Sequence, residues 1–175
     1  MIIFETGRLI VRRYTDDDKD NLFQLNGDEE IMRYIRKPKT KEECDRHHEE
    51  ILAGYNQKIE MGRWAAEEKL TKEFIGTFVI VPIPAQPDKI QLGYALLKQY
   101  WGKGYATELT KAGLHFAFDQ LCLDLIYGVT EIQNTVSQKV LLKSGFKEAE
   151  AFMEDGKNLL LFSFAKTDWK INGSN

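Results

Sequence analysis

The sequence predicts one α/β domain over residues 1–175, with a mixed, mostly antiparallel central sheet of about seven strands and about four flanking helices. Three observations predict this class. Runs of β-branched and aromatic residues recur in the middle and at the end of the chain with short polar turns between them, as antiparallel strands require. Helical patterns precede these runs and lie between them. At 175 residues and 43% hydrophobic composition, the chain can fill one core.

The N-terminal third predicts one strand followed by helices. A β-rich run precedes the acidic cluster Thr15–Asp18, whose side chains favour a helix start. The helical pattern breaks at Asn26-Gly27 and again at Pro38, and the charged segment after it carries the spaced apolar residues of a mostly solvated helix. We therefore expect a strand over 9–14 and helices over 15–25, 28–35 and 40–61.

The rest of the chain predicts six further strands. Two of them, Trp64–Glu67 and Phe74–Ile83, are antiparallel neighbours in this interpretation. The prolines at positions 82, 84 and 87 cannot donate to a central ladder, so they predict a loop before the next strand. Beyond this loop we expect strands over 89–97, 125–130, 146–154 and 158–164, and helices over 106–121 and 136–144.

Composition and charge exclude several function classes. The 24 Lys and Arg residues against 27 Asp and Glu give a net charge of −3, without the cation excess that bulk nucleic-acid binding requires. No apolar run approaches the ~20 residues of a membrane span, and no signal peptide is recognisable. Cys44 and Cys122 stand far apart, so we expect reduced thiols and a cytoplasmic protein. Cys44 and His48 share a helix face, but two ligands do not predict a metal site.

A glycine-rich turn, Gly102-Lys103-Gly104, connects a predicted strand to a predicted helix. Glycines let backbone N–H groups approach a ligand, and a helix N-terminus adds free amides and partial positive charge. This turn favours a pyrophosphate, with Lys103 at its rim. A dinucleotide-binding fingerprint fails because Thr107 occupies its third glycine position, and no P-loop string occurs. A turn needed only for chain reversal is the alternative.

A second polar segment, Asn134-Thr135-Val136-Ser137, opens the next predicted helix. Asn134 stands at the N-cap, a structural role that would explain it alone. Ser137 places a hydroxyl at the mouth between two strands, near the point to which a ligand on the Gly102 turn would extend. A neutral surface hydroxyl is the other interpretation of Ser137.

Together these residues resemble the GNAT superfamily of acetyl-CoA-dependent N-acetyltransferases. Gln99, Gly102 and Gly104 fit its Q/R-x-x-G-x-G/A pyrophosphate loop, and Leu92-Gly93-Tyr94-Ala95-Leu96 fits the strand before that loop. The resemblance covers about residues 5 to 165, nearly the whole chain.

Within the superfamily, the sequence resembles the ribosomal-protein alanine N-acetyltransferase branch. That branch typically begins with a strand like Thr6–Arg12 and continues with a stretch like Asp28–Tyr34. It also carries N-x-x-S before a late Gly-Phe pair, here Asn134 to Ser137 and Gly145-Phe146.

The resemblance implies a sheet that splays between its fourth and fifth strands, here Tyr94–Leu97 and Leu125–Thr130, with acetyl-CoA as co-substrate in the opening. The pantetheine arm would bond the exposed backbone of the fourth strand. Apart from the resemblance, neither C-x-x-C nor H-E-x-x-H occurs in the sequence, so we expect no metal. The implied cofactor-binding residues are Ala95, Leu96, Leu97, Gln99, Gly102, Lys103, Gly104, Tyr105, Ala106, Thr107 and Asn134.

The resemblance also implies direct transfer in a ternary complex, in which a backbone amide near Ala95 or Leu96 stabilises the developing oxyanion. Many members protonate the leaving thiolate with a Tyr where this chain has Leu141, so Ser137 is implied as the catalytic acid. Gln91 stands where relatives often carry Glu. The base is therefore open among a water chain, Glu67 or Glu68, and an amine that arrives neutral.

The implied acceptor is the primary amine of a protein N-terminus or of a small molecule. A polyamine or an aminoglycoside-like amine is the alternative substrate, a non-catalytic acetyl-CoA-binding module is the alternative class, and a homodimer stays open. We expect acceptor choice to lie in residues 28–61, whose acidic side chains would attract a cationic amine unless they only form a solvated helix face. These acids are Asp28, Glu29, Glu30, Glu42, Glu43, Asp45, Glu49 and Glu50.

Overall fold

The computed structural model describes residues 1–55 and 61–172. Eight strands form one sheet in the order β1-β2-β3-β4-β5-β6-β8-β7, and every neighbouring pair except β5–β6 is antiparallel. The predicted α/β class is confirmed. The strands are β1 (Ile2–Glu5), β2 (Leu9–Arg12), β3 (Gly62–Glu68), β4 (Phe74–Ile83), β5 (Gln86–Leu96), β6 (Leu125–Glu131), β7 (Lys147–Glu154) and β8 (Lys157–Ala165). The helices are α1 (Lys19–Asn26), α2 (Glu29–Met32), α3 (Lys41–Gly54), α4 (Tyr105–His115), α5 (Thr135–Lys143) and α6 (Lys166–Asn172).

The sheet opens between β5 and β6. The two strands pair in parallel only at Gln91 and Tyr127, whereas β5 stays paired with β4 as far as Leu96 opposite Gly76. Beyond Gln91 the edge of β5 that faces β6 is therefore exposed. This is the predicted splay, and it separates the fifth and sixth strands because the sequence analysis missed β1.

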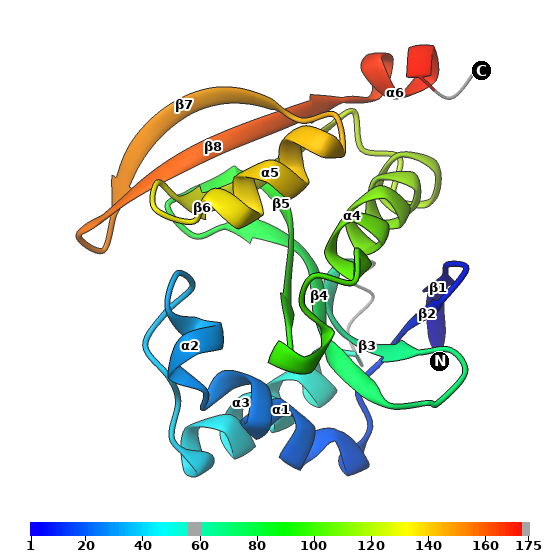
Figure 1. The fold of residues 1–175 in the computed structure, drawn as a ribbon, viewed down its shortest axis with the longest axis vertical. Helices are drawn as coiled ribbons and strands as arrows, with labels where there is room; N and C mark the ends of the chain where they lie inside the picture. The colour runs from blue at the N-terminus through cyan, green and yellow to red at the C-terminus, as the bar shows by residue number, and fades with distance from the viewer. Residues whose placement is uncertain (56–60, 173–175) are drawn as a thin grey trace.

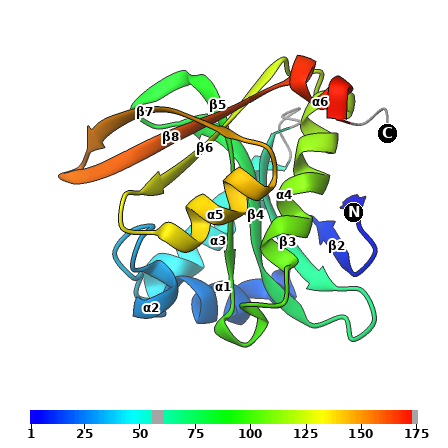
Figure 2. The same ribbon diagram turned by 45° about the horizontal axis from the view of Figure 1, so that its top comes forward.

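The helices form two groups around this opening. Helices α4 and α5 cover one face of the sheet, while α1, α2 and α3 gather at one end of the molecule (Figures 1 and 2). Glycines permit α4 and α5 to pack closely against the sheet. A Cβ at Gly113 of α4 would lie 2.3 Å from the Phe78 ring, and one at Gly128 of β6 would lie 2.6 Å from the Leu141 side chain of α5. Both helices are thereby held against the sheet beside the opening.

Several predicted elements have different bounds in the structure. Helix α3 ends at Gly54, and residues 56–60 of the helix predicted to reach Met61 lie outside the described residues. The predicted proline loop is a two-residue turn, Pro84-Ala85, with Pro82 and Pro87 inside β4 and β5. The strands tolerate these prolines because the β4–β5 register shifts between Pro82 and Ile83.

Two elements at the chain ends carry too little local pattern to be predicted. Strand β1 pairs with β2, and its Phe4 ring lies 5.3 Å from that of Phe78. Helix α6 docks Trp169 at 6.1 Å from Phe118 and 6.3 Å from Phe164. Each is a short segment stabilised by packing against residues distant in sequence, since isolated segments of this length are marginal in water.

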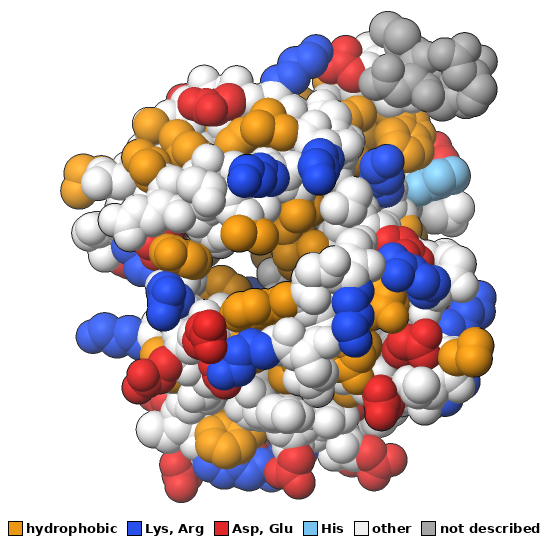
Figure 3. Space-filling view, in the orientation of Figure 1, with side chains coloured by type: hydrophobic (Ala, Val, Ile, Leu, Met, Phe, Trp, Pro, Cys, Tyr) orange, Lys and Arg blue, Asp and Glu red, His pale blue; other side chains and the backbone are white. Residues whose placement is uncertain are grey.

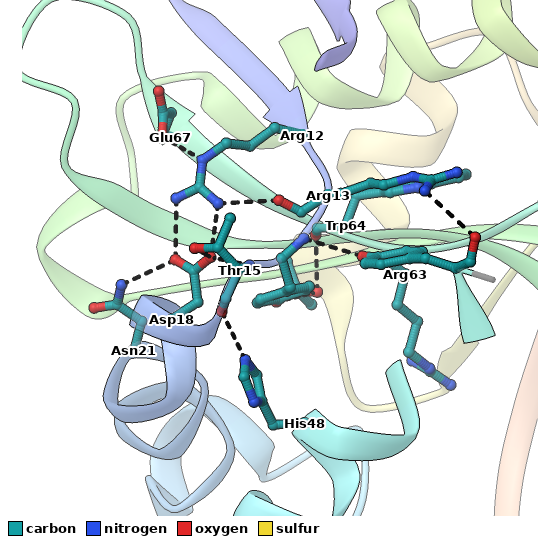
Figure 4. Close-up of polar contacts among 12 residues, drawn as sticks. Arg12, Arg13, Thr15, Asp18, Asn21, His48, Arg63, Trp64 and Glu67 are labelled. Atoms are coloured by element: carbon teal, nitrogen blue, oxygen red, sulfur yellow. Dashed lines mark hydrogen bonds and ion pairs between the residues drawn. The ribbon is translucent and has the colours of Figure 1, made fainter. Parts of the chain in front are cut away.

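A charged network attaches the N-terminal helices to the sheet (Figure 4). Arg12 of β2 donates to Asp18 at 2.7 and 3.0 Å and to Glu67 of β3 at 2.6 Å. A ring nitrogen of the buried His48 donates to the Thr15 carbonyl at 2.9 Å, which gives this histidine a structural partner. Among residues 1–55 and 61–172, no three His, Cys, Asp or Glu side chains are grouped to hold a metal ion. No helix in these ranges has the length and apolar character to cross a membrane.

Candidate active site

A cleft of about 480 Å³ lies where β5 and β6 diverge. Its walls come from residues 30–35 after the start of α2, residues 92–96 of β5, the loop and helix start at 100–107, residues 128–130 of β6 and one face of α5 from Val136 to Leu141. The molecular face is hollowed here, with hydrophobic side chains inside and charged ones around the rim (Figure 3). A second cavity, of about 650 Å³, lies against β1, α3 and β3, and its described lining residues include no predicted site residue.

The cleft collects nine of the twelve predicted site residues. These nine are Ala95, Leu96, Gly102, Gly104, Tyr105, Ala106, Thr107, Asn134 and Ser137. The other three side chains lie elsewhere: Leu97 is buried in the core, and Gln99 and Lys103 are exposed. The Lys103 ammonium lies 5.2 Å from the centre of the Tyr100 ring.

The glycine loop leaves the first amides of α4 open to a ligand. Gly102 and Gly104 adopt φ values of +72° and +81°, which residues other than glycine rarely adopt. Helix α4 begins directly after them at Tyr105. No side chain caps this N-terminus. The free N–H groups and the positive end of the helix dipole therefore offer a site for an anion.

Aromatic anchors fix the loop to the sheet. The Trp101 indole donates to the Leu96 carbonyl at 2.8 Å, and the Tyr100 hydroxyl donates to Glu73 at 2.8 Å. Burial, together with the Glu73 carboxylate, raises the pKa of Tyr100 to about 12, so the phenol keeps its proton at neutral pH.

The backbone of β5 presents alternate amides to the opening. The Leu97 N–H donates to the Ile75 carbonyl at 2.8 Å, and successive backbone groups point to opposite edges of a strand. The Tyr94 and Leu96 N–H groups therefore point toward the opening, whereas the Ala95 N–H points toward β4. Of the two amides considered from sequence for an oxyanion, the geometry favours that of Leu96.

Ser137 lies in the first turn of α5, where the Asn134 side chain accepts from its backbone N–H at 3.1 Å. The predicted N-cap role of Asn134 is therefore present. The Ser137 hydroxyl lies beside the Tyr94 phenol of β5, a residue that the sequence analysis assigned only to the strand. Burial raises the pKa of Tyr94, and the nearby Ser137 side chain offsets only part of this rise. Strand alternation could have placed Tyr94 on this face, but not next to α5.

The cleft offers few groups for a general base. Glu30 is the only carboxylate among the described residues that line it, and no histidine lines it. Glu67 is bound to Arg12, and Glu68 accepts the N–H groups of Leu70 and Thr71 at 2.9 and 2.7 Å. Both of these sequence candidates lie outside the cleft lining.

Residues 8–147 match the acetyltransferase (GNAT) domain family. The chain belongs to this family. It is 30% identical to an uncharacterised N-acetyltransferase of Bacillus subtilis over 148 residues, which cover 83% of each chain. Acetyl transfer from acetyl-CoA to an amine is accordingly the activity of this acetyltransferase.

Solved structures share the fold of the acetyltransferase. A Vibrio cholerae spermidine N-acetyltransferase in complex with CoA and spermine superposes with a TM-score of 0.78 at 20% identity, covering 94% of this chain and 99% of its own. A ribosomal-protein-S5-alanine acetyltransferase from Vibrio fischeri gives 0.74 at 20% identity, covering 97% and 98%. At this identity both show the fold, and neither decides the acceptor.

Most predicted acceptor-attracting acids of the acetyltransferase have other partners or lie away from the cleft. Asp28 caps α2 and lies 2.8 Å from the Lys98 ammonium, whose hydrogen bond holds the Asp28 pKa below its usual range. Glu43 caps α3, Asp45 pairs with Lys19 and Lys41, and Glu50 lies near His47. Of the predicted segment, the part that the structure describes (28–55 and 61) reaches the cleft only within residues 30–35.

Proposed function

We propose that the acetyltransferase modifies a compact monoamine, with a protein N-terminus as the best-fitting class, as in the ribosomal-protein alanine branch. The observation that carries this proposal is the charge of the cleft wall. Glu30, the one carboxylate among the described lining residues, lies 3.2 Å from the Lys98 ammonium, and Arg33 adds a positive charge to the same wall. A polyamine would need several carboxylates to replace its lost hydration.

The chain's own groups account for binding acetyl-CoA, which supplies an activated thioester. The amides at the start of α4 bind the pyrophosphate, with Gly102 and Gly104 permitting close backbone approach. The β5 edge near Leu96 bonds the pantetheine arm. In the transfer, the amine nitrogen bonds the acetyl carbon, the carbon–sulfur bond breaks, and the Leu96 N–H donates to the carbonyl oxygen as negative charge develops.

Ser137 donates a proton to the departing sulfur and regains one, through water, from the nitrogen that has bonded the acetyl carbon. Tyr94 orients the serine hydroxyl. Burial raises the pKa of Tyr94, so its phenol keeps its proton at neutral pH and remains a hydrogen-bonding partner for the serine. Leu141 fills the space beside Gly128 that a larger acid on α5 would need.

The amine loses its proton to water in this proposal, because the inner end of the cleft presents no carboxylate among its described residues. We expect kcat/KM to rise with pH up to the pKa of the free amine. A pH profile for two amines of different pKa measures this. An acidic limb common to both amines would instead identify an enzyme base.

The acceptor class is tested by CoA release with an alanine-starting peptide and with spermidine at equal concentration. We expect kcat/KM for the peptide to exceed that for spermidine by at least about tenfold, and Arg33→Glu to narrow the ratio because it reverses the charge of the wall. Lys72→Glu, at an exposed position in the β3–β4 turn, is the matched charge reversal. Preference for spermidine by the wild-type protein would overturn the proposed acceptor class.

Ser137→Ala tests the proton donor. We expect kcat to fall by roughly 10²–10⁴-fold with little change in acetyl-CoA affinity, as for removal of a positioned acid. Thr135→Ala removes an exposed hydroxyl from the same helix turn and should leave kcat unchanged. Retained kcat in Ser137→Ala would assign the proton to water.

A further inference from the structure

Arg8, in the turn between β1 and β2, reaches across the molecule to the glycine loop. Its guanidinium donates to the Lys103 carbonyl at 3.0 Å and to the Glu108 carboxylate at 2.7 Å. The same group lies 4.4 Å from the centre of the Tyr105 ring. One side chain thus contacts the loop, the first residue of α4 and the first-turn carboxylate of that helix.

Glu108 completes this connection from the side of α4. Its carboxylate accepts from the Thr6 hydroxyl at 2.5 Å and from the Arg8 backbone N–H at 3.0 Å, besides the guanidinium. Although burial acts to raise the pKa of Glu108, the hydrogen bonds from Thr6 and Arg8 lower it below the usual value. A general preference for acids in the first turn of a helix does not explain these specific partners.

The Lys103 carbonyl belongs to the peptide unit that carries the Gly104 N–H. A trans peptide points its C=O and N–H in opposite directions, so holding the carbonyl fixes the direction of the amide. Gly104 lines the cleft and Arg8 does not. With the carbonyl held toward Arg8, the Gly104 N–H is directed to the cleft side of the loop.

We propose that Arg8 and Glu108 form a latch that orients the Lys103–Gly104 peptide for the pyrophosphate of acetyl-CoA. Both are positioning residues. The proposal rests on the pyrophosphate site assigned to this loop under the proposed function. Because Glu108 neutralises Arg8 at 2.6 Å, the latch acts by orienting the amide rather than by attracting the phosphates over a distance.

The test compares two acetyl donors with Arg8→Ala and Glu108→Gln. Acetyl-CoA carries the pyrophosphate, whereas S-acetylpantetheine carries the same thioester without it. In Arg8→Ala we expect the KM for acetyl-CoA and the Kd for CoA to rise about tenfold, the effect of one lost charge-assisted hydrogen bond. In the same variant, the kcat at saturating acetyl-CoA and the kcat/KM for S-acetylpantetheine should each stay within about twofold of the wild-type value. Glu108→Gln should shift the same two constants in the same direction by a smaller factor.

Lys69→Ala is the matched control. The Lys69 ammonium pairs with Glu5 at 2.5 Å and bonds the Thr6 carbonyl, so its loss weakens the same hairpin without touching the loop. We expect it to leave the Kd for CoA unchanged. An unchanged Kd in Arg8→Ala, or an equal loss of kcat/KM with both donors, would overturn the latch. Failure of the wild-type protein to bind CoA would overturn the pyrophosphate site itself.

Discussion

The loop at residues 100–107 and the segment at residues 30–35 line the same cleft but are held in different ways. The shape of the loop is set by its backbone, which has two glycines at positive φ and leads directly into a helix. Hydrogen bonds of Tyr100, Trp101 and Arg8 also join it to three other parts of the chain. The α2 segment depends on the Asp28 cap and on one cation, Lys98, that bridges Asp28 and Glu30.

This difference separates a part of the cleft that tolerates little change from a part that tolerates more. A backbone-built anion site fails when its φ values or amide directions change, whatever the side chains are. A wall built from side chains on a short helix can exchange them while the sheet and the loop keep their positions. If the amine enters beside residues 30–35, as the proposed function has it, this segment is where relatives of one fold can differ in substrate.

The largest effect is expected for Gly104→Val. The β-branched side chain opposes φ +81° and obstructs the approach of a phosphate, so the Kd for acetyl-CoA should rise at least ~100-fold by calorimetric titration. Gly156→Val is the control, because Gly156 has φ +76° in the β7–β8 turn and similarly open space. Equal affinity in both folded variants would remove the loop from the cofactor site.

A large effect on stability is expected for Arg12→Ala. It leaves the buried Asp18 carboxylate without its cation, so the free energy of unfolding should fall by about 3 kcal/mol in urea at pH 7. The pKa of Asp18 is lowered in the folded wild type, although burial opposes this, and Arg12 hydrogen bonds are the main lowering cause. The Asp18–Arg12 stabilisation is thus complete above the unfolded pKa of ~3.9 and lost as pH falls through the folded value.

The variant should therefore lose most relative to wild type at pH 7 and progressively less as pH falls through the acid range, where Asp18 takes up a proton. Lys41→Ala removes the surface pairs with Asp20 and Asp45 and should cost much less than Arg12→Ala at either pH. A deficit in Arg12→Ala that does not depend on pH would mean that packing rather than charge holds the N-terminal helices.

A moderate effect is expected for Tyr94→Phe. Loss of the phenol beside Ser137 should lower kcat about tenfold while the KM for acetyl-CoA stays near wild type, since the ring that lines the cleft is retained. Tyr127→Phe, on the neighbouring strand, serves as the control in the same steady-state assay. A change in KM alone would assign Tyr94 to binding.

The smallest effect on the cofactor is expected when residues 30–35 are exchanged with those of a relative of different substrate range. Amine preference should change, and acetyl-CoA affinity should stay within about threefold, because this segment and the glycine loop are separate parts of the cleft wall. An unchanged preference in a folded chimera would move acceptor choice to the β4–β5 turn or to β7 and β8.

Particular elements show how far local pattern extends. The Gly102–Gly104 turn and the Asn134 cap can be predicted from the sequence. Glycine permits the positive φ of the turn, and an asparagine side chain before a helix accepts one of its free N–H groups. The ends of β4 and β5 are not, since a shifted register lets Pro82 lie inside a strand. The acids of residues 28–61 are visible as charge, but their ion pairs and caps follow from the helix faces that pack together.

The sequence alone determined the α/β class, the glycine turn before α4 and the position of Ser137 in the first turn of α5, because each depends on backbone preferences and on residues close together in the chain. The tertiary structure decided which side chains from distant parts of the chain lie next to one another. Tyr94 lies beside Ser137, 43 positions apart, and Arg8 reaches Lys103 and Glu108, about a hundred positions away. These pairs depend on the angle at which α4 and α5 cross the opened sheet, which the packing of the whole core sets.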